Sequence, residues 1–148
     1  MTADVALDRF KRVEREDDND TVIDYQRSVE WQDTSYTWVT AYWDAERYCN
    51  NLTLGGYDNW SLPSVNDLQS IIRPMAYDED GSPLRTDEYR YMYRKYFKHL
   101  GTVGYWSAGV NDNYPQANTA TVINYGNGSS SSVNIDYQMN VRCVRSRS

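Results

Sequence analysis

The sequence lacks the features that mark several protein classes. No apolar run approaches the roughly 18 residues that a membrane-spanning helix needs. Acidic residues outnumber basic ones by 21 to 15, which gives a net charge of −6. Proteins that bind nucleic acid use clustered lysine and arginine against the phosphates, and this balance is the opposite. We therefore expect neither membrane insertion nor nucleic-acid binding.

Histidine is almost absent, because the chain holds only one, His99. We expect it to be structural, since a cation suits the C-terminal end of the helix predicted around it. The G-x-S-x-G turn that presents the nucleophile of many hydrolases is also missing. These shortages argue against an enzyme.

Cysteine is scarce as well, with two in 148 residues. Cys49 and Cys143 either form a disulfide or stay as two buried thiols, a common state for cysteine. A bridge between them would close a long loop and add about 4–5 kcal/mol to the stability of the protein. Residues 1–20 are charged and show no signal peptide. Either the protein is not secreted by that route, or its leader is not part of this sequence.

Aromatic residues are abundant: they make up 14% of the chain, with 14 Tyr and 5 Trp. Their volume offsets a hydrophobic content of only 40% in building a core. The length fits one domain, 1–148. We expect strands over 9–14, 21–25 and 29–31, where apolar positions alternate.

Two helices are predicted in the first half of the chain. Thr40 is suited to cap a helix over 41–53, which Gly55–Gly56 ends. Ser64 and Asp67 match the capping-box pattern of a second helix that stops before Pro74.

The second half begins with a third predicted helix, over 87–99, and then changes to a strand pattern. A strand over 103–107 is followed by a hairpin, with strands 121–125 and 129–135 around the turn 126–128. The last expected strand covers 140–145.

Several short blocks, in a fixed order, resemble the Lcl C-terminal domain family of collagen-like adhesins. They are Trp43, Ala45, Tyr48, Cys49 and Leu52; then Gly56, Tyr57, Trp60, Leu62, Pro63 and Ser64; then Tyr105–Trp106–Ser107; then Ala120, Ile123, Tyr125 and Gly128; then Val141 to Arg145. Ala45 stands one residue closer to Trp43 than in the family pattern. Ser61 and Thr121 replace a usual Arg and Trp. The resemblance spans about residues 9–145.

This resemblance implies an α+β, C-type lectin-like fold of the kind also found in formylglycine-generating enzymes. Such a fold has a mixed or antiparallel sheet, two to three helices, long loops, and adjacent N- and C-terminal strands. It also favours the Cys49–Cys143 disulfide, and therefore an oxidising location: extracellular, cell-surface or periplasmic. It places Trp43, Trp60 and Trp106 in the core. With both cysteines structural, formylglycine-type oxidation is not expected.

Polar and aromatic residues near the C-terminus are the best candidates for ligand contact. Tyr offers contact area at low entropic cost, and Ser and Asn adapt their hydrogen bonds. The candidate residues are Asn111, Asp112, Asn113, Tyr114, Asn118, Asn124, Tyr125, Asn127, Asn134 and Tyr137. The alternative is an ordinary polar loop region between strands.

We expect no cofactor and no metal site. The acidic segments Asp17–Asp20 and Asp78–Gly81 offer oxygens to calcium, but neither matches a known calcium loop, and both fit solvated turns. Arg142 and Arg145 are expected to pair with carboxylates rather than to bind anions.

Together these features predict a non-enzymatic module of a bacterial or phage surface. It would bind a glycan or a protein through its C-terminal loops. The composition of residues 111–140 also resembles the output of a diversity-generating retroelement. The alternative function is an oligomerising or structural module of a surface or filament assembly, suggested by the Tyr-rich segment 87–99.

Overall fold

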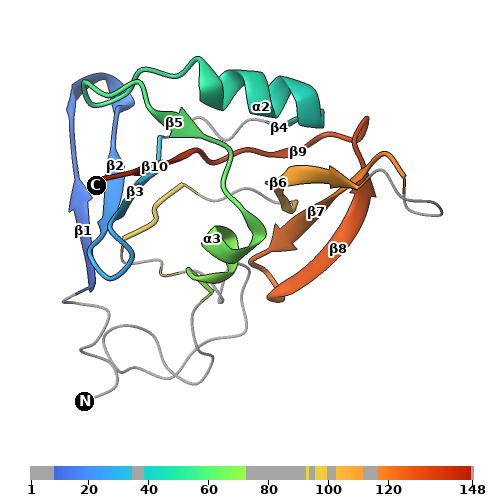
Figure 1. Ribbon diagram of the computed structural model, residues 1–148. Coiled ribbons are helices and arrows are strands. Elements are labelled where there is room, and N and C mark those ends of the chain that lie inside the picture. The colour runs from blue at the N-terminus through green and yellow to red at the C-terminus, as the bar shows by residue number, and fades with distance from the viewer. Residues whose placement is uncertain are drawn as a thin grey trace.

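Two five-stranded sheets form the framework of the molecule (Figure 1). The computed structural model describes residues 9–34, 39–72, 93, 96–99, 103–111 and 117–147. Within these residues the sheets are accompanied by two α-helices, so the expected α+β class is confirmed. None of the helices in these described ranges is long and apolar enough to span a bilayer.

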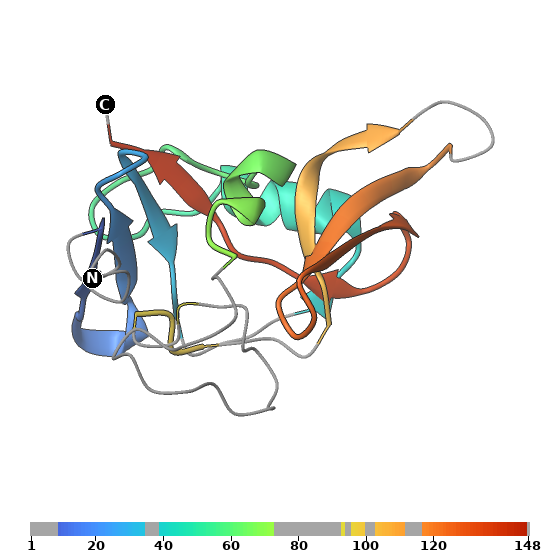
Figure 2. The ribbon, with the colours of Figure 1, turned by 90° about the horizontal axis from the view of Figure 1, so that it is seen from below.

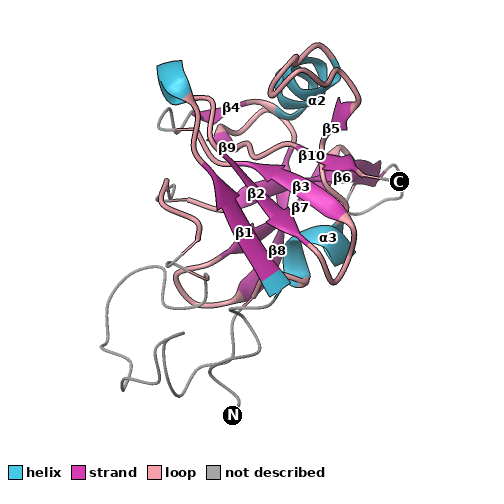
Figure 3. Ribbon diagram, turned by 90° about the vertical axis from the view of Figure 1, so that its left-hand side faces the viewer, coloured by secondary structure: helices cyan, strands magenta, loops and turns pink. Residues whose placement is uncertain are grey.

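The first sheet joins strands from both ends of the chain. Its order is β1 (Phe10–Val13), β2 (Thr21–Asp24), β3 (Val29–Gln32), β10 (Val144–Ser146) and β5 (Trp60–Ser61), and every neighbouring pair is antiparallel. Figure 3 views the molecule from the side of this sheet. β10 lies against β3, so N- and C-terminal strands share one sheet as expected.

The second sheet takes one short strand from the first half of the chain and the others from the second half. Its order is β4 (Val39–Thr40), β9 (Met139–Asn140), β6 (Tyr105–Asn111), β7 (Thr119–Asn124) and β8 (Ser129–Asn134). β7 and β8 form the predicted hairpin. Only the β6–β9 pair is parallel. The single strand expected over 140–145 is instead split into β9 and β10, because residues 141–143 cross from one sheet to the other.

Helices α2 (Tyr42–Asn50) and α3 (Val65–Gln69) both occupy predicted positions. At α3 the capping box is complete: the Ser64 hydroxyl accepts from the Asp67 N–H at 3.0 Å, and the Asp67 carboxylate accepts from the Ser64 N–H at 2.9 Å. At α2 the expected cap is wrong. Ala41 is the N-cap, and Thr40 is used instead by strand β4, where it pairs with Met139.

The third predicted helix, over 87–99, falls mostly outside the described residues. Where it is described, at 96–99, the backbone is a turn followed by irregular structure. His99 therefore does not lie at the end of a helix, and that part of the prediction is wrong.

The side chains pack into two apolar clusters. One lies between the sheets at α3 and includes Trp31, Leu68, Phe97 and Ile123. The other lies under α2 and includes Trp60 and Trp106, both buried as predicted, together with the two cysteines. Cys49 of α2 and Cys143 are joined by the expected disulfide. The bridge therefore fastens helix α2 to the segment that crosses between the sheets, directly before β10.

Candidate ligand-binding surface

One end of the second sheet gathers residues from three strands. The register places Asn111 opposite Thr119, and Thr119 opposite Asn134. The Asn118 N–H donates to the Asn111 carbonyl at 2.8 Å, and the Ile135 N–H donates to the Asn118 carbonyl at 3.0 Å. Figure 2 shows this end of β6, β7 and β8 pointing away from the first sheet. We call it the distal end.

The start of helix α2 is attached to the same place. The Tyr42 N–H donates to the Ile135 carbonyl at 2.9 Å, and the Tyr42 hydroxyl accepts from the Gly109 N–H at 2.8 Å. The Tyr42 ring is buried and packs edge-on against Trp106, with ring centres 5.6 Å apart. Because both its backbone and its hydroxyl bond to the distal end, Tyr42 fixes the helix there.

The pKa of Tyr42 is consistent with this anchoring role. Burial raises it, the Gly109 N–H acts in the opposite direction, and the nearby Glu46 carboxylate raises it further. The net effect is a pKa above the ordinary value for tyrosine. The hydroxyl thus keeps its proton at neutral pH and serves as a fixed neutral group.

Trp43 is not in the core, and this corrects the prediction. Its side chain is 50% exposed, and its ring meets that of Tyr42 edge-on at 5.0 Å. The core position is taken by Tyr42, which is 1% exposed and lies three residues before the buried Ala45. The family pattern has an aromatic residue three positions before its alanine. The short spacing between Trp43 and Ala45 was therefore the signal that Tyr42 faces inward.

Four of the predicted contact residues lie at the distal end. Asn118, Asn134 and Tyr137 are exposed, the last to 62%, and Asn111 is half-buried. The Asn134 amide oxygen accepts from the Asp136 N–H at 2.9 Å, which shapes the turn that presents Tyr137. Together with Trp43 these residues form what we call the distal surface: Trp43, Asn111, Asn118, Asn134 and Tyr137.

Two other predicted contact residues, Asn124 and Asn127, do not join this surface. Asn124 and Asn127 lie at the hairpin turn, on the other side of a six-residue strand, which is a separation of about 17 Å at 3.4 Å per residue. Both use their amide oxygens within the turn: Asn124 accepts from the Gly126 N–H, and Asn127 from Ser129. Asp112, Asn113 and Tyr114 lie outside the described residues.

Tyr125 belongs to the core and is withdrawn as a contact residue. Its side chain is 2% exposed, its hydroxyl donates to the Leu68 carbonyl at 2.5 Å, and its ring packs against Tyr105. Burial raises its pKa well above the ordinary value. The sequence pattern of the hairpin did not separate this inward tyrosine from the exposed polar positions around it.

The two arginines near the C-terminus pair with carboxylates, as predicted. Arg142 donates to Asp33 at 2.6 Å and Arg145 to Glu30 at 2.8 Å, and all four side chains are almost fully buried. Arg12 also reaches Asp33. These guanidinium groups therefore stabilise the framework through ion pairs and are not available to a ligand.

Asp33 is the centre of this buried network. Burial alone would raise the pKa of its carboxyl, but Arg142, the Lys98 N–H and Arg12 more than compensate and hold it below its ordinary value. Burial lowers the pKa of Arg142, whereas Tyr105 and Asp33 raise it above its ordinary value. Both groups thus stay ionised, which suits a structural ion pair.

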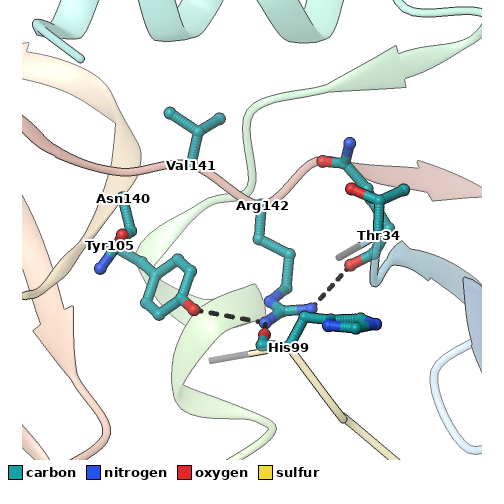
Figure 4. A pocket seen from close by; sticks show the side chains of 7 residues that line it. Thr34, His99, Tyr105, Asn140, Val141 and Arg142 are labelled. Carbon is teal, nitrogen blue, oxygen red and sulfur yellow. Dashed lines mark hydrogen bonds between the residues drawn. The ribbon is translucent and has the colours of Figure 1, made fainter. Parts of the chain in front are cut away.

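A small polar pocket lies beside Arg142, lined also by Thr34, His99 and Tyr105 (Figure 4). Its volume is about 10 Å³, the room that one water molecule requires. The Arg142 Nε atom is buried and has no hydrogen-bond partner among the described residues. A single bound water would satisfy it, so this pocket suits hydration of the network better than a ligand.

The comparison with known families agrees with the blocks described above. The sequence profile of the Lcl C-terminal domain matches residues 20–145. The chain belongs to the Lcl C-terminal domain family. Comparison with curated proteins gives no match. In this family member the buried ion pairs and the disulfide build the frame, and the distal surface displays exposed side chains.

Proposed function

We propose that this Lcl C-terminal domain is a non-enzymatic recognition module that binds a glycan or a protein through its distal surface. One observation carries the proposal. Two exposed aromatic rings accompany the three asparagines of the distal surface: Tyr137 follows β8, and Trp43 follows Tyr42, which bonds helix α2 to the distal end.

The chemistry of these side chains suits reversible contact. An exposed aromatic ring offers a flat apolar face to the C–H groups of a sugar or to an apolar side chain, and loses little entropy on binding. Asparagine amides both donate and accept hydrogen bonds, which suits sugar hydroxyls and peptide groups alike. Because the backbone behind them is held by the sheet and by Tyr42, little ordering is needed when a ligand binds.

The charges nearby favour an uncharged or basic ligand. Asp136 is exposed next to Tyr137, and the one basic side chain in α2, Arg47, is paired with Asp44. A sulfated or acidic glycan would meet no unpaired arginine or lysine among the described residues of this surface. We therefore expect it to bind more weakly than a neutral glycan.

The family membership and the sheet arrangement support a C-type lectin-like fold for this module, with N- and C-terminal strands in one sheet. The disulfide supports an oxidising location, at the cell surface or in the periplasm. Both are part of the proposal.

A glycan array together with a protein pull-down tests the proposal, using Trp43→Ala and Tyr137→Ala. Tyr25→Ala is the matched control, because Tyr25 is also an aromatic residue about half exposed (49%), but lies in the first sheet, after β2. We expect both distal variants to lose at least tenfold in affinity (about 1.4 kcal/mol or more) and the control to bind normally. Equal binding by all three variants, or loss only in Tyr25→Ala, would refute this site.

Assembly is a second candidate function, and one observation favours it. In the part of the chain that the structure describes, β8 is the outer strand of the second sheet, and Ser129, Ser130, Ser131 and Ser132 are all exposed along it. Such an uncharged edge can pair with another strand. Light scattering that finds only a monomer at high concentration would remove this candidate.

A further inference from the structure

A histidine and two aspartates from distant parts of the chain meet on the surface of the molecule. The ligand atoms of Asp18, Asp20 and His99 all lie within 4.8 Å of one another, and all three residues are half-buried. Asp18 ends the short 3₁₀ turn η2 (Glu16–Asp18) that follows β1, and Asp20 immediately precedes β2. His99 is some 80 positions further along the chain.

The buried network fixes His99 in this place. Asp33 accepts from the backbone N–H of Lys98 at 2.7 Å and from that of His99 at 3.2 Å. The His99 carbonyl accepts from Arg142. Both backbone groups of His99 are therefore held, and Figure 4 shows its ring on the side of Arg142 opposite Tyr105.

Asp20 is equally well oriented. One carboxylate oxygen accepts from the Arg15 N–H at 2.7 Å, and the other accepts from the Arg12 guanidinium at 2.9 Å. Hydrogen bonds of this kind, made by groups behind a ligand, orient metal-binding carboxylates and histidines in proteins. Each oxygen keeps a further lone pair for a second partner.

The turn is rich in carboxylates. It carries four, those of Glu16, Asp17, Asp18 and Asp20. The positive charge of Arg12 is shared between Asp20 and the buried Asp33, and that of Arg15 lies 3.5 Å from Glu30. Both arginines therefore also interact with carboxylates outside the turn.

We propose that Asp18, Asp20 and His99 form a binding site for a divalent transition metal such as Zn²⁺, with water completing the coordination. Zinc binds imidazole nitrogen and carboxylate oxygen at about 2.0–2.2 Å, so its ligand atoms stand roughly 3–4 Å apart. Three atoms already within 4.8 Å need only a small inward movement. Calcium prefers sites made entirely of oxygen, so a histidine ligand selects against it.

Calorimetric titration of the protein, freed of any histidine tag, with ZnCl₂ and separately with CaCl₂ tests the site. We expect Zn²⁺ to bind with a stoichiometry of one and Ca²⁺ to bind far more weakly. His99→Gln and Asp18→Asn should each weaken Zn²⁺ binding by at least about tenfold, the lower bound seen for lost second-shell partners.

Asp17→Asn is the matched control. Asp17 and Asp18 are neighbours with φ of 59° and 60°, a conformation that asparagine also tolerates, and each substitution removes one negative charge. Only Asp18 belongs to the cluster. Equal losses in Asp17→Asn and Asp18→Asn would mean general attraction to an acidic turn, and would overturn the proposal. Absence of zinc binding, or full binding by His99→Gln, would overturn it as well. The recognition proposal would be unaffected, because the distal surface uses other residues.

Discussion

The two sheets differ in the kind of polar side chain they hold and in whether it is buried or exposed. The first sheet buries charge: Asp24 and Glu30 are 0% and 2% exposed and are paired with Arg9 and Arg145. The hairpin of the second sheet is uncharged, and the serines of β8 are open to solvent. Buried ion pairs tolerate little change, because losing one partner leaves an uncompensated charge. Exposed uncharged positions tolerate a great deal. The molecule thus separates a half held by buried charge from a half whose exposed positions tolerate substitution.

Removing the disulfide should have the largest effect, since it joins the two halves. Cys49→Ser with Cys143→Ser opens a loop with a sequence separation of 94, for which loop entropy predicts a loss of about 4–5 kcal/mol. Urea unfolding measures it, and reduction of the unmodified protein should give a similar loss. A loss below about 1 kcal/mol would show that packing alone holds the halves together.

Breaking the buried network should cost almost as much. Asp33→Asn keeps the shape of the side chain but leaves Arg142 buried without its counter-charge, and we expect a loss of about 3–5 kcal/mol. Arg47→Ala is the control, because its ion pair with Asp44 is largely exposed and worth about 0.5 kcal/mol or less. Similar losses in the two variants would contradict the contrast between buried and exposed charge.

Acid should lower the stability of the folded protein by protonating the same carboxylate, that of Asp33. The pKa of Asp33 is lower in the folded protein than its ordinary 3.8, so the unfolded chain binds this proton more readily. Its contribution to stability is therefore complete above pH 3.8 and falls as the pH drops from there through the folded-state pKa. Urea unfolding measured between pH 5 and pH 2 should show that the free energy of unfolding falls less steeply with decreasing pH in Asp33→Asn than in the unmodified protein. If stability depended on pH equally in both proteins, carboxylates other than Asp33 would be responsible for the loss in acid.

A smaller loss of stability is expected from a substitution at the contact between the second sheet and α3. Tyr125→Phe removes the hydroxyl that donates to the Leu68 carbonyl and should cost about 1 kcal/mol. Ser132→Ala, on the exposed face of β8, should stay within about 0.5 kcal/mol. If the serine variant proved the more destabilising, the hairpin surface would be part of the frame rather than free to vary.

Much of the frame could be predicted from the sequence. Alternating apolar residues located β1, β2, β3 and the β7–β8 hairpin, and Ser64 with Asp67 located the start of α3. The disulfide followed from the family resemblance rather than from spacing. Local patterns suffice here because alternating apolar positions and the capping box are properties of short stretches of sequence.

The candidate surface was only partly predictable, because it depends on contacts between distant segments. Trp43 was assigned to the core by the family resemblance, whereas the structure buries Tyr42, whose backbone N–H donates to the Ile135 carbonyl. Tyr125 was assigned to the surface, although α3 covers it. The meeting of His99 with Asp18 and Asp20 depends on Asp33 and Arg142, which no local pattern relates to any of them.

The position of β10 has a consequence for biosynthesis. This strand, Val144–Ser146, is the last in chain order, yet it lies between β3 and β5. While the chain is being made, β3 has an open edge and Cys49 has no partner until the ribosome has released the region around residue 143. The first sheet can therefore be completed, and the cysteine pair closed, only after this C-terminal region has been made.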